Sequence, residues 1–146
     1  MDSIKKCKRN RVLIAEDEGC LRRLLEELCE AAGFRVDAVY EGRAAWALIS
    51  SLLDVYALVF LDLCMPEWSG DDVLAMLNNL SSPRKFVVVI SGFIDNKTRA
   101  EFECHPNVFR ILDKPFSTRE ISAILEAAVV ENRIERRSRR EDSDGV

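Results

Sequence analysis

Five polar side chains stand at the ends of short apolar stretches that are far apart in this sequence. They are the carboxylates of Glu16, Asp17 and Asp62, the hydroxyl of Ser91 and the ammonium group of Lys114. Carboxylates that crowd together repel one another unless a cation or a proton offsets their charge. A hard divalent cation with oxygen ligands would do so, and Mg²⁺ suits a site with few carboxylates and several retained waters.

A cluster of this composition would suit the transfer of a phosphoryl group, which depends mainly on positioning and charge neutralisation. Lys114 would supply a mobile positive charge and Ser91 a hydroxyl. Asp62 could act as the nucleophile and form an aspartyl phosphate, as carboxylates do in some transfers. Each residue alone also has an ordinary structural interpretation, as a helix-terminal acid, a cap or a turn residue. Chance explains the joint pattern less easily.

The apolar stretches read as strands, and segments with helical spacing of apolar residues follow them. The predicted strands are 11–15, 34–39, the run that ends at Asp62, 86–90 and 108–112. The predicted helices are 21–32, 41–53, 70–80, 95–103 and one that begins at Ser117 or Thr118. Alternating strands and helices predict an α/β fold with a parallel sheet between helices. The polar side chains should then converge at the carboxyl edge of the sheet, where ligands bind in such folds.

The composition is that of one ordinary globular domain. The chain has 146 residues, of which 48% are hydrophobic and 32% charged, which is enough to build one core. No apolar run approaches the length of a membrane span, and the N-terminus lacks the apolar core of a signal peptide, so we expect a cytoplasmic protein. The five cysteines include no C-x-x-C pair, which favours isolated thiols over a disulfide framework or a zinc site.

Charge is distributed unevenly, although the formal net charge is only −4. Basic residues gather between Lys5 and Arg11 and again at 133–140, whereas the body between them is acidic. Basic ends are more often solvated tails, and an acidic body argues against nucleic acid as the main ligand. We expect a basic segment at 1–10, one domain at 11–130, and at 131–146 an extension of the last helix followed by a charged, disordered tail.

Four stretches, in their order and spacing, closely resemble the receiver domain of two-component response regulators. They are VLIAEDE at 12–18, LDLCMP at 61–66 with Gly70 after it, VISG at 89–92 and KPF at 114–116. The resemblance covers about residues 11–130. It implies a single flavodoxin-like domain, with five parallel strands in the order 2-1-3-4-5 and helices on both faces.

The resemblance also implies a phosphoacceptor and its donor. Asp62 would take a phosphoryl group from a phosphohistidine on a histidine kinase or a histidine phosphotransfer protein. Asp17 would bind Mg²⁺ with help from Glu16, and Asp62 and the backbone carbonyl of Cys64 would complete the protein ligands. Such a protein is a signalling receiver, which catalyses only its own phosphorylation and dephosphorylation.

Other implied roles belong to the residues that would hold the phosphoryl group. Ser91 and Lys114 would contact its oxygens. The peptide bond between Lys114 and Pro115 would be cis, as is typical in similar proteins and permitted at proline. Phosphorylation would switch a protein-interaction surface formed by the fourth helix, the fifth strand and the fifth helix.

The sequence departs from the family pattern at several of these positions. Glu16 stands where the family more often has Asp, a common variant that leaves metal binding plausible. Ile111 stands where the family usually places a Tyr or Phe switch residue, which puts the coupled motion of hydroxyl and aromatic ring in doubt. Phe109 lies two residues earlier, so its side chain should point to the same face as that of Ile111.

Phe93 and Cys64 occupy positions that line the site in similar proteins, two residues after Ser91 and Asp62. A phenylalanine cannot orient an attacking water molecule by hydrogen bonding. We therefore expect the phosphorylated state to decay slowly.

The last helix has a second row of apolar residues beside its core face. The row consists of Ala123, Ala127, Val130 and Ile134. It would suit a homodimer or a partner helix, and the surface of the fourth helix, fifth strand and fifth helix is the other candidate for dimerisation. The simpler interpretation is a broad core face followed by a solvated helix end.

Three other functions compete with a phosphorylated receiver. A pseudo-receiver that acts only as a dimerisation or docking module is compatible with Ile111, although intact Asp17, Asp62 and Lys114 argue against it. A metal-dependent phosphatase with an aspartyl nucleophile usually has a second Asp two residues after the first, where this chain has Cys64. A nucleotide-binding fold is disfavoured because the sequence contains no G-x-G-x-x-G motif and no P-loop.

Overall fold

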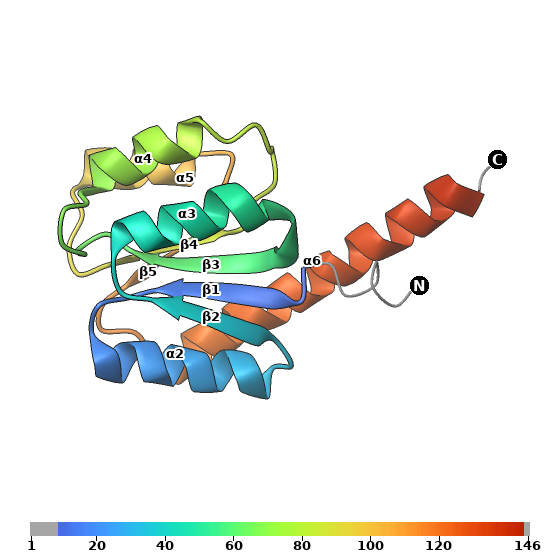
Figure 1. Ribbon diagram of the computed structural model, residues 1–146, viewed down its shortest axis with the longest axis horizontal. Coiled ribbons are helices and arrows are strands. Elements are labelled where there is room, and N and C mark those ends of the chain that lie inside the picture. Colours follow the sequence, from blue (N-terminus) through green and yellow to red (C-terminus); the bar gives the residue numbers. More distant parts are fainter. Residues whose placement is uncertain (1–8, 145–146) are drawn as a thin grey trace.

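A five-stranded parallel sheet forms the centre of the molecule (Figure 1). The computed structural model describes the backbone of residues 9–144, and side chains as far as residue 132 except at positions 53 and 70. The strand order is β2-β1-β3-β4-β5, which confirms the predicted flavodoxin-like topology. The strands are β1 (Arg11–Ala15), β2 (Arg35–Val39), β3 (Tyr56–Asp62), β4 (Val87–Ser91) and β5 (Val108–Asp113).

Helices cover both faces of this sheet. Figure 1 shows α2 and α6 on one face and α3, α4 and α5 on the other. The helices are α2 (Gly19–Ala31), α3 (Gly42–Leu52), α4 (Gly70–Asn78), α5 (Asn96–Glu103) and α6 (Thr118–Asp144), and a short 3-10 helix, η1 (Leu53–Val55), precedes β3. Each lies within a few residues of the helix predicted from apolar spacing, whereas η1 was not predicted.

Two apolar cores form because the central strands are buried on both sides. Alternate residues of β3 point to opposite faces, so that Val59 and Leu61 pack toward α3 and α4 while Phe60 packs toward α2 and α6. Every residue of β4 is buried. Full burial of one large apolar side chain contributes about 1.5–3 kcal/mol to the free energy of unfolding. The two cores therefore hold the strands, and with them the carboxyl edge of the sheet, in fixed register.

Local sequence signals account for several helix ends. Gly33 follows α2 with a φ of 97°, a left-handed conformation that glycine adopts without steric cost. Ser117 Oγ accepts a hydrogen bond from the N–H of Glu120 at 3.2 Å, and the Glu120 carboxylate accepts one from the N–H of Ser117 at 2.7 Å. This reciprocal pair is a capping box, and it begins the helix that was predicted to start at Ser117 or Thr118.

One prediction about β5 is wrong. Phe109 and Ile111 do not share a face: Phe109 packs in the core beneath α6, whereas Ile111 packs against the core on the α3–α5 side. The register between β4 and β5 shifts next to Val87, which pairs with Val108, while Val88 pairs with Arg110. A bulge places an extra residue in β5, which breaks the simple alternation of faces at Phe109.

The last helix is longer than the sequence suggested. Its backbone is helical to Asp144, whereas the charge pattern predicted that the extension of this helix within 131–146 would give way to a disordered tail. Glu and Arg, which dominate this stretch, are good helix formers despite their charge. Figure 1 shows the end of α6 projecting beyond the body of the domain, on the side opposite the carboxyl ends of the strands.

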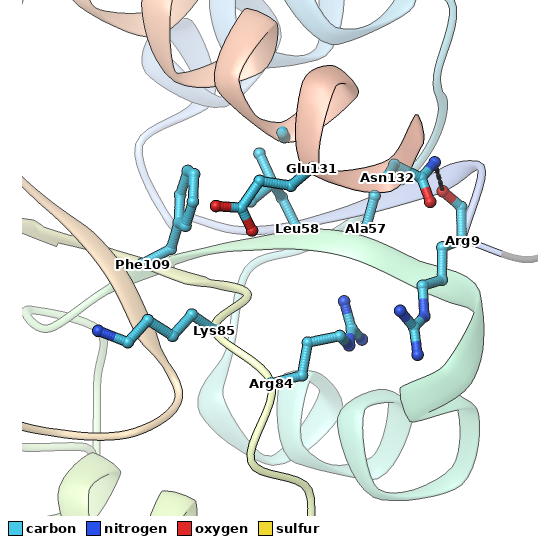
Figure 2. Close-up of a pocket in the computed structure, with 9 residues that line it drawn as sticks. Arg9, Ala57, Leu58, Arg84, Lys85, Phe109, Glu131 and Asn132 are labelled. Atoms are coloured by element: carbon cyan, nitrogen blue, oxygen red, sulfur yellow. Dashed lines mark hydrogen bonds between the residues drawn. The ribbon is translucent and has the colours of Figure 1, made fainter. Parts of the chain in front are cut away.

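A small pocket lies at this opposite edge of the sheet, between α6 and the start of β3 (Figure 2). Its volume is only about 20 Å³, and Ala57, Leu58 and Phe109 contribute apolar walls. Asn132 of α6 donates a hydrogen bond from Nδ2 to the backbone carbonyl of Arg9 at 3.3 Å. This contact holds Arg9, which belongs to the predicted basic segment 1–10, against α6. Residues 1–8 of that segment lie outside the described residues.

His105 joins three segments on the α4–α5 side of the sheet. Its Nδ1 accepts a hydrogen bond from the N–H of Asn107 at 3.1 Å, and its Nε2 lies 3.0 Å from Asn78 Oδ1. Asn107 donates from Nδ2 to the carbonyls of Ser82 and Arg84 at 2.7 and 2.9 Å. An accepting Nδ1 requires a neutral ring with its proton on Nε2. Burial lowers the pKa of His105 from its ordinary value of 6.5.

This network makes the stability of the domain depend on pH. Because the pKa of His105 is lower in the folded state, the unfolded chain binds more protons once the pH falls below 6.5. The free energy of unfolding should therefore decrease as the pH falls below 6.5. We expect His105→Gln to cost about 1 kcal/mol at pH 7.5, the usual worth of a hydrogen bond, and to flatten this decrease. Urea unfolding of both proteins at several pH values is the measurement; parallel curves would contradict it.

Candidate functional site

The five predicted polar residues meet at the carboxyl edge of the sheet. Glu16 follows β1 directly, Asp62 and Ser91 are the last residues of β3 and β4, and Lys114 follows β5. Glu16, Asp62 and Ser91 are completely buried, whereas Asp17 is exposed. The parallel sheet is the reason that they meet, since it brings all strand ends of one polarity to one edge.

The carboxylates of Glu16, Asp17 and Asp62 form a tight cluster. Each offers an oxygen, and these oxygens lie within 4.8 Å of one another. Glu16 Oε1 accepts a hydrogen bond from the N–H of Glu18 at 3.1 Å, but Oε2 is buried and has no hydrogen-bond partner among the described residues. Burial and the neighbouring Asp62 carboxylate raise the pKa of Glu16 to about 8, although the Glu18 N–H and Lys114 oppose this shift.

Lys114 is the cation that faces this cluster. Its Nζ lies 2.9 Å from Asp62 Oδ2 and 3.6 Å from Glu16 Oε1. Burial by itself would lower the pKa of Lys114, but the hydrogen bond and charge of Asp62, together with Glu16, raise it overall. The backbone N–H of Lys114 also donates to the carbonyl of Ser91 at 2.8 Å. The bond between Lys114 and Pro115 is cis, as predicted.

Asp62 is held by donors on both of its oxygens. Lys114 occupies Oδ2, and the N–H of Cys64 donates to Oδ1 at 2.8 Å. The hydroxyl of Ser91 is buried at the end of the adjacent strand and has no hydrogen-bond partner in the described part of the chain. Buried polar atoms are normally satisfied. This edge therefore offers an ammonium group, a backbone N–H and a hydroxyl beside one carboxylate, which is a donor set that suits phosphoryl oxygens.

The acidic cluster fits a divalent cation. A buried carboxylate oxygen without a partner, next to two further carboxylates, costs free energy unless a positive charge compensates it. The donor set consists of carboxylate oxygens, which are the hard ligands that Mg²⁺ prefers, and it is incomplete enough to leave several water ligands in place. The chemistry of the residues is thus consistent with the predicted magnesium site.

Other predicted residues lie around the site in different ways. Cys64 contributes its N–H to Asp62, and its side chain is exposed. Phe93 is 86% exposed in the loop after β4, so its ring is open to a partner or to solvent. Ile111 is half-buried against the core and makes no polar contact that would couple it to Ser91 as a Tyr hydroxyl could.

Arg22 was missed by the sequence reasoning. Its Nη1 donates to the backbone carbonyl of Glu16 at 3.0 Å, and its guanidinium lies over the ring of Tyr40 at 5.7 Å from the centroid. It braces the turn between β1 and α2 that presents Glu16 and Asp17. Nothing in the spacing of the sequence marks Arg22, because the contact depends on how the helix leaves the strand.

Comparison with known proteins gives the family. Residues 12–126 match the family model described as the response regulator receiver domain. The chain therefore belongs to the family of response regulator receiver domains, which are parts of two-component systems. Among the described residues, no helix is both long and apolar enough to cross a membrane.

Similar proteins differ in how much of their length this chain spans. It is 26% identical to the response regulator receiver protein CpdR of Brucella abortus over 82% of this chain and 97% of that protein. It is 30% identical to the transcriptional regulatory protein SrrA of Staphylococcus aureus, over 77% of this chain but only 44% of that protein. For the 3',5'-cyclic-nucleotide phosphodiesterase regA of Dictyostelium discoideum the identity is 28%, over 79% of this chain and 14% of that protein.

Solved structures agree with the fold. The beryllofluoride-activated NtrC4 receiver domain dimer is 25% identical, with a TM-score of 0.71 over 84% of this chain and 98% of that one. A CheY-like receiver domain protein from Methanospirillum hungatei is 17% identical, with a TM-score of 0.73 over 87% of this chain and 98% of that one. The second likeness concerns the fold alone.

The acidic cluster predicts that Mg²⁺ stabilises the folded protein. A ligand at a hundred times its dissociation constant adds about 2.7 kcal/mol to the free energy of unfolding, which corresponds to a rise of roughly 5–10 °C in Tm. Asp17→Asn should abolish most of this rise, because it removes one carboxylate of the cluster. Asp54→Asn, in η1, serves as the control and should keep it. Thermal unfolding with and without Mg²⁺ measures both; an unchanged response in Asp17→Asn would argue against this metal site.

Proposed function

We propose that this receiver domain accepts a phosphoryl group on Asp62 from a phosphohistidine of a histidine kinase or a histidine phosphotransfer protein. One observation carries the proposal: Asp62 is a fully buried carboxylate with Lys114 2.9 Å from one oxygen and the N–H of Cys64 2.8 Å from the other. Membership of the receiver family supports it. We regard the domain as a signalling receiver that catalyses only its own phosphorylation and dephosphorylation, and not as an enzyme.

The transfer needs a nucleophile and neutralisation of the phosphoryl charge. A carboxylate oxygen of Asp62 attacks phosphorus as the bond from phosphorus to the imidazole nitrogen of the donor breaks, and the leaving imidazole keeps the electron pair and takes up a proton from solvent. Lys114 balances the negative charge on the phosphoryl oxygens. The N–H of Cys64 and the hydroxyl of Ser91 donate hydrogen bonds to them.

Mg²⁺ is the proposed cofactor. Glu16, Asp17 and Asp62 would hold it through carboxylate oxygens, and the backbone carbonyl of Cys64 would complete the protein ligands. When bound, the cation supplies positive charge that offsets the phosphoryl oxygens. The buried Oε2 atom of Glu16, which has no hydrogen-bond partner within the described residues, supports this assignment.

Phosphorylation is proposed to switch the surface formed by α5, β5 and α6. Ser91 links the site to this surface, because its carbonyl accepts the N–H of Lys114 and its hydroxyl is available to a phosphoryl oxygen. A homodimer could use this surface or the apolar row on α6, where Val130 is 53% exposed. We propose residues 11–130 as the functional unit and the cytoplasm, where such donors act, as its location.

A pseudo-receiver that works only as a docking or dimerisation module is the second candidate. The half-buried Ile111 favours it, since an aliphatic side chain cannot follow the hydroxyl of Ser91 as a hydrogen-bonding aromatic residue can.

Labelling with a small phosphodonor separates these two candidates. Wild-type protein incubated with acetyl phosphate and Mg²⁺ should take up close to one phosphoryl group per chain, and a chelator should abolish uptake. Asp62→Ala should fall to background, because the nucleophile is lost, whereas Asp54→Ala should label like the wild type. A wild-type protein that is folded by circular dichroism but remains unlabelled would favour the docking module.

A slow loss of the phosphoryl group is expected because Phe93 offers no hydrogen bond to an attacking water. Phe93→Gln should accelerate the loss by about tenfold, less than a fully positioned acceptor contributes, because the side chain at this position is exposed. Phe93→Leu is the control and should decay like the wild type. The decay of label after removal of the phosphodonor is the measurement, and a wild-type lifetime of minutes or less would count against the hypothesis.

A further inference from the structure

The indole ring of Trp68 lies directly against the backbone of Gly42. A Cβ atom at Gly42 would stand 2.2, 2.3 and 2.4 Å from ring atoms Cδ2, Cε2 and Cγ of Trp68. These distances are far below van der Waals contact, and Gly42 is itself buried. Glycine is therefore required at this helix start by the space that the ring occupies.

Trp68 belongs to the loop that follows the phosphoacceptor. This loop, residues 63–69, begins with the N–H of Cys64 on Asp62 and ends at Ser69, whose side chain caps α4 in a reciprocal pair with Asp72. Within it, Glu67 has a φ of 70°, a conformation that costs a residue other than glycine about 1 kcal/mol or more and persists only where its surroundings enforce it. The two residues that directly follow Glu67 supply contacts that can enforce this conformation: Trp68 packs on Gly42, and Ser69 caps α4.

Gly42 belongs to the other side of the site. It begins α3, shortly after β2 ends at Val39. The carbonyl of Val39 accepts a hydrogen bond from the N–H of Glu16 at 3.1 Å. The contact between Trp68 and Gly42 therefore joins the loop that carries Asp62 and Cys64 to the chain segment that supports Glu16.

We propose that Trp68 is a positioning residue for the cation and phosphoryl site. Its ring packs against Gly42 and thereby fixes the position of loop 63–69. In this position Asp62 and the backbone of Cys64 lie close enough to Glu16 and Asp17 for all of them to bind one cation. Trp68 acts through the backbone and touches neither the cation nor the phosphoryl group. This inference rests on the proposed function, since it concerns the metal and the phosphoacceptor of that same site.

The position of the ring makes this role testable without destroying the core. Trp68 is half-buried and also lines an open groove of about 410 Å³ with Arg43, Glu67 and Met76. A shorter side chain at position 68 removes the contact with Gly42. This contact lies near the surface and not in the centre of the core, so the fold should survive. Trp46 lies on α3 and packs on the core, so Trp46→Phe leaves Trp68 as the single fluorophore.

The test compares four changes in the full-length Trp46→Phe protein. Gly42→Ala forces the ring from its seat, Trp68→Ala removes the ring, and Trp68→Phe keeps an aromatic side chain there. Gly19→Ala is the matched control, because it makes the same change at the first residue of α2, where the nearest atom to the new Cβ is 3.8 Å away. Mg²⁺ binding is measured by calorimetry, the state of the ring by fluorescence, and folding by circular dichroism and urea unfolding.

Gly42→Ala and Trp68→Ala should weaken Mg²⁺ binding by about tenfold, at the low end of the effects of residues that orient metal ligands. Trp68→Phe and Gly19→Ala should bind as the parent does. In Gly42→Ala the fluorescence of Trp68 should shift toward that of a solvated ring. Phosphate uptake by the weakened variants should recover at saturating Mg²⁺, because the phosphoacceptor is intact.

The inference would be overturned if Gly42→Ala and Trp68→Ala lowered only the free energy of unfolding and left the Mg²⁺ affinity unchanged. The proposed function would then still stand. Should Gly42→Ala fail to fold, Trp68→Ala decides the question. A wild-type protein that binds Mg²⁺ but takes up no phosphate would overturn the proposed function only. A wild-type protein that binds no Mg²⁺ would overturn the inference.

Discussion

The burial of two carboxylates beside one lysine is the constraint on which this structure depends. Taking a charge out of water is costly unless opposite charge and hydrogen bonds replace the solvent. Asp62 meets this condition through Lys114 and the N–H of Cys64, whereas Glu16 meets it only partly and has a raised pKa. When both carboxyl groups are ionised, the negative charge at this edge of the sheet is only partly balanced, which is a cost in stability and also the basis for binding a cation.

A rigid frame is needed to keep these charges in place. Lys114 is 52 residues from Asp62 in the chain, yet their side chains meet at 2.9 Å. The two apolar cores on either side of β3 and β4 provide the frame, because strands packed on both faces cannot change register without exposing buried side chains. The contacts at the rim, Arg22 on the carbonyl of Glu16 and Trp68 on Gly42, then adjust the turns and loops that this frame leaves free.

The sequence predicted an element best where the local pattern of apolar residues and the tertiary packing both favour the same secondary structure. The strands ending at Ala15, Asp62 and Ser91 were found because their apolar runs are short, continuous and bounded by polar residues. It failed at Phe109, where a bulge between β4 and β5 changes the face of one residue. It also predicted a disordered tail after the helix extension in 131–146, where the backbone is helical to Asp144, because charge density indicates solvation and does not report helical propensity.

By itself, the sequence determined the α/β class, the order of strands and helices, and the residues that stand at the strand ends. These follow from periodicity and from the polarity of parallel strands, which are properties of neighbouring residues. Only the tertiary structure decided which oxygen of Asp62 faces Lys114, that Glu16 Oε2 and Ser91 Oγ lack partners among the described residues, and that Trp68 sits on Gly42. Such contacts join segments that are distant in the chain, and their geometry is set by the packing of the whole domain.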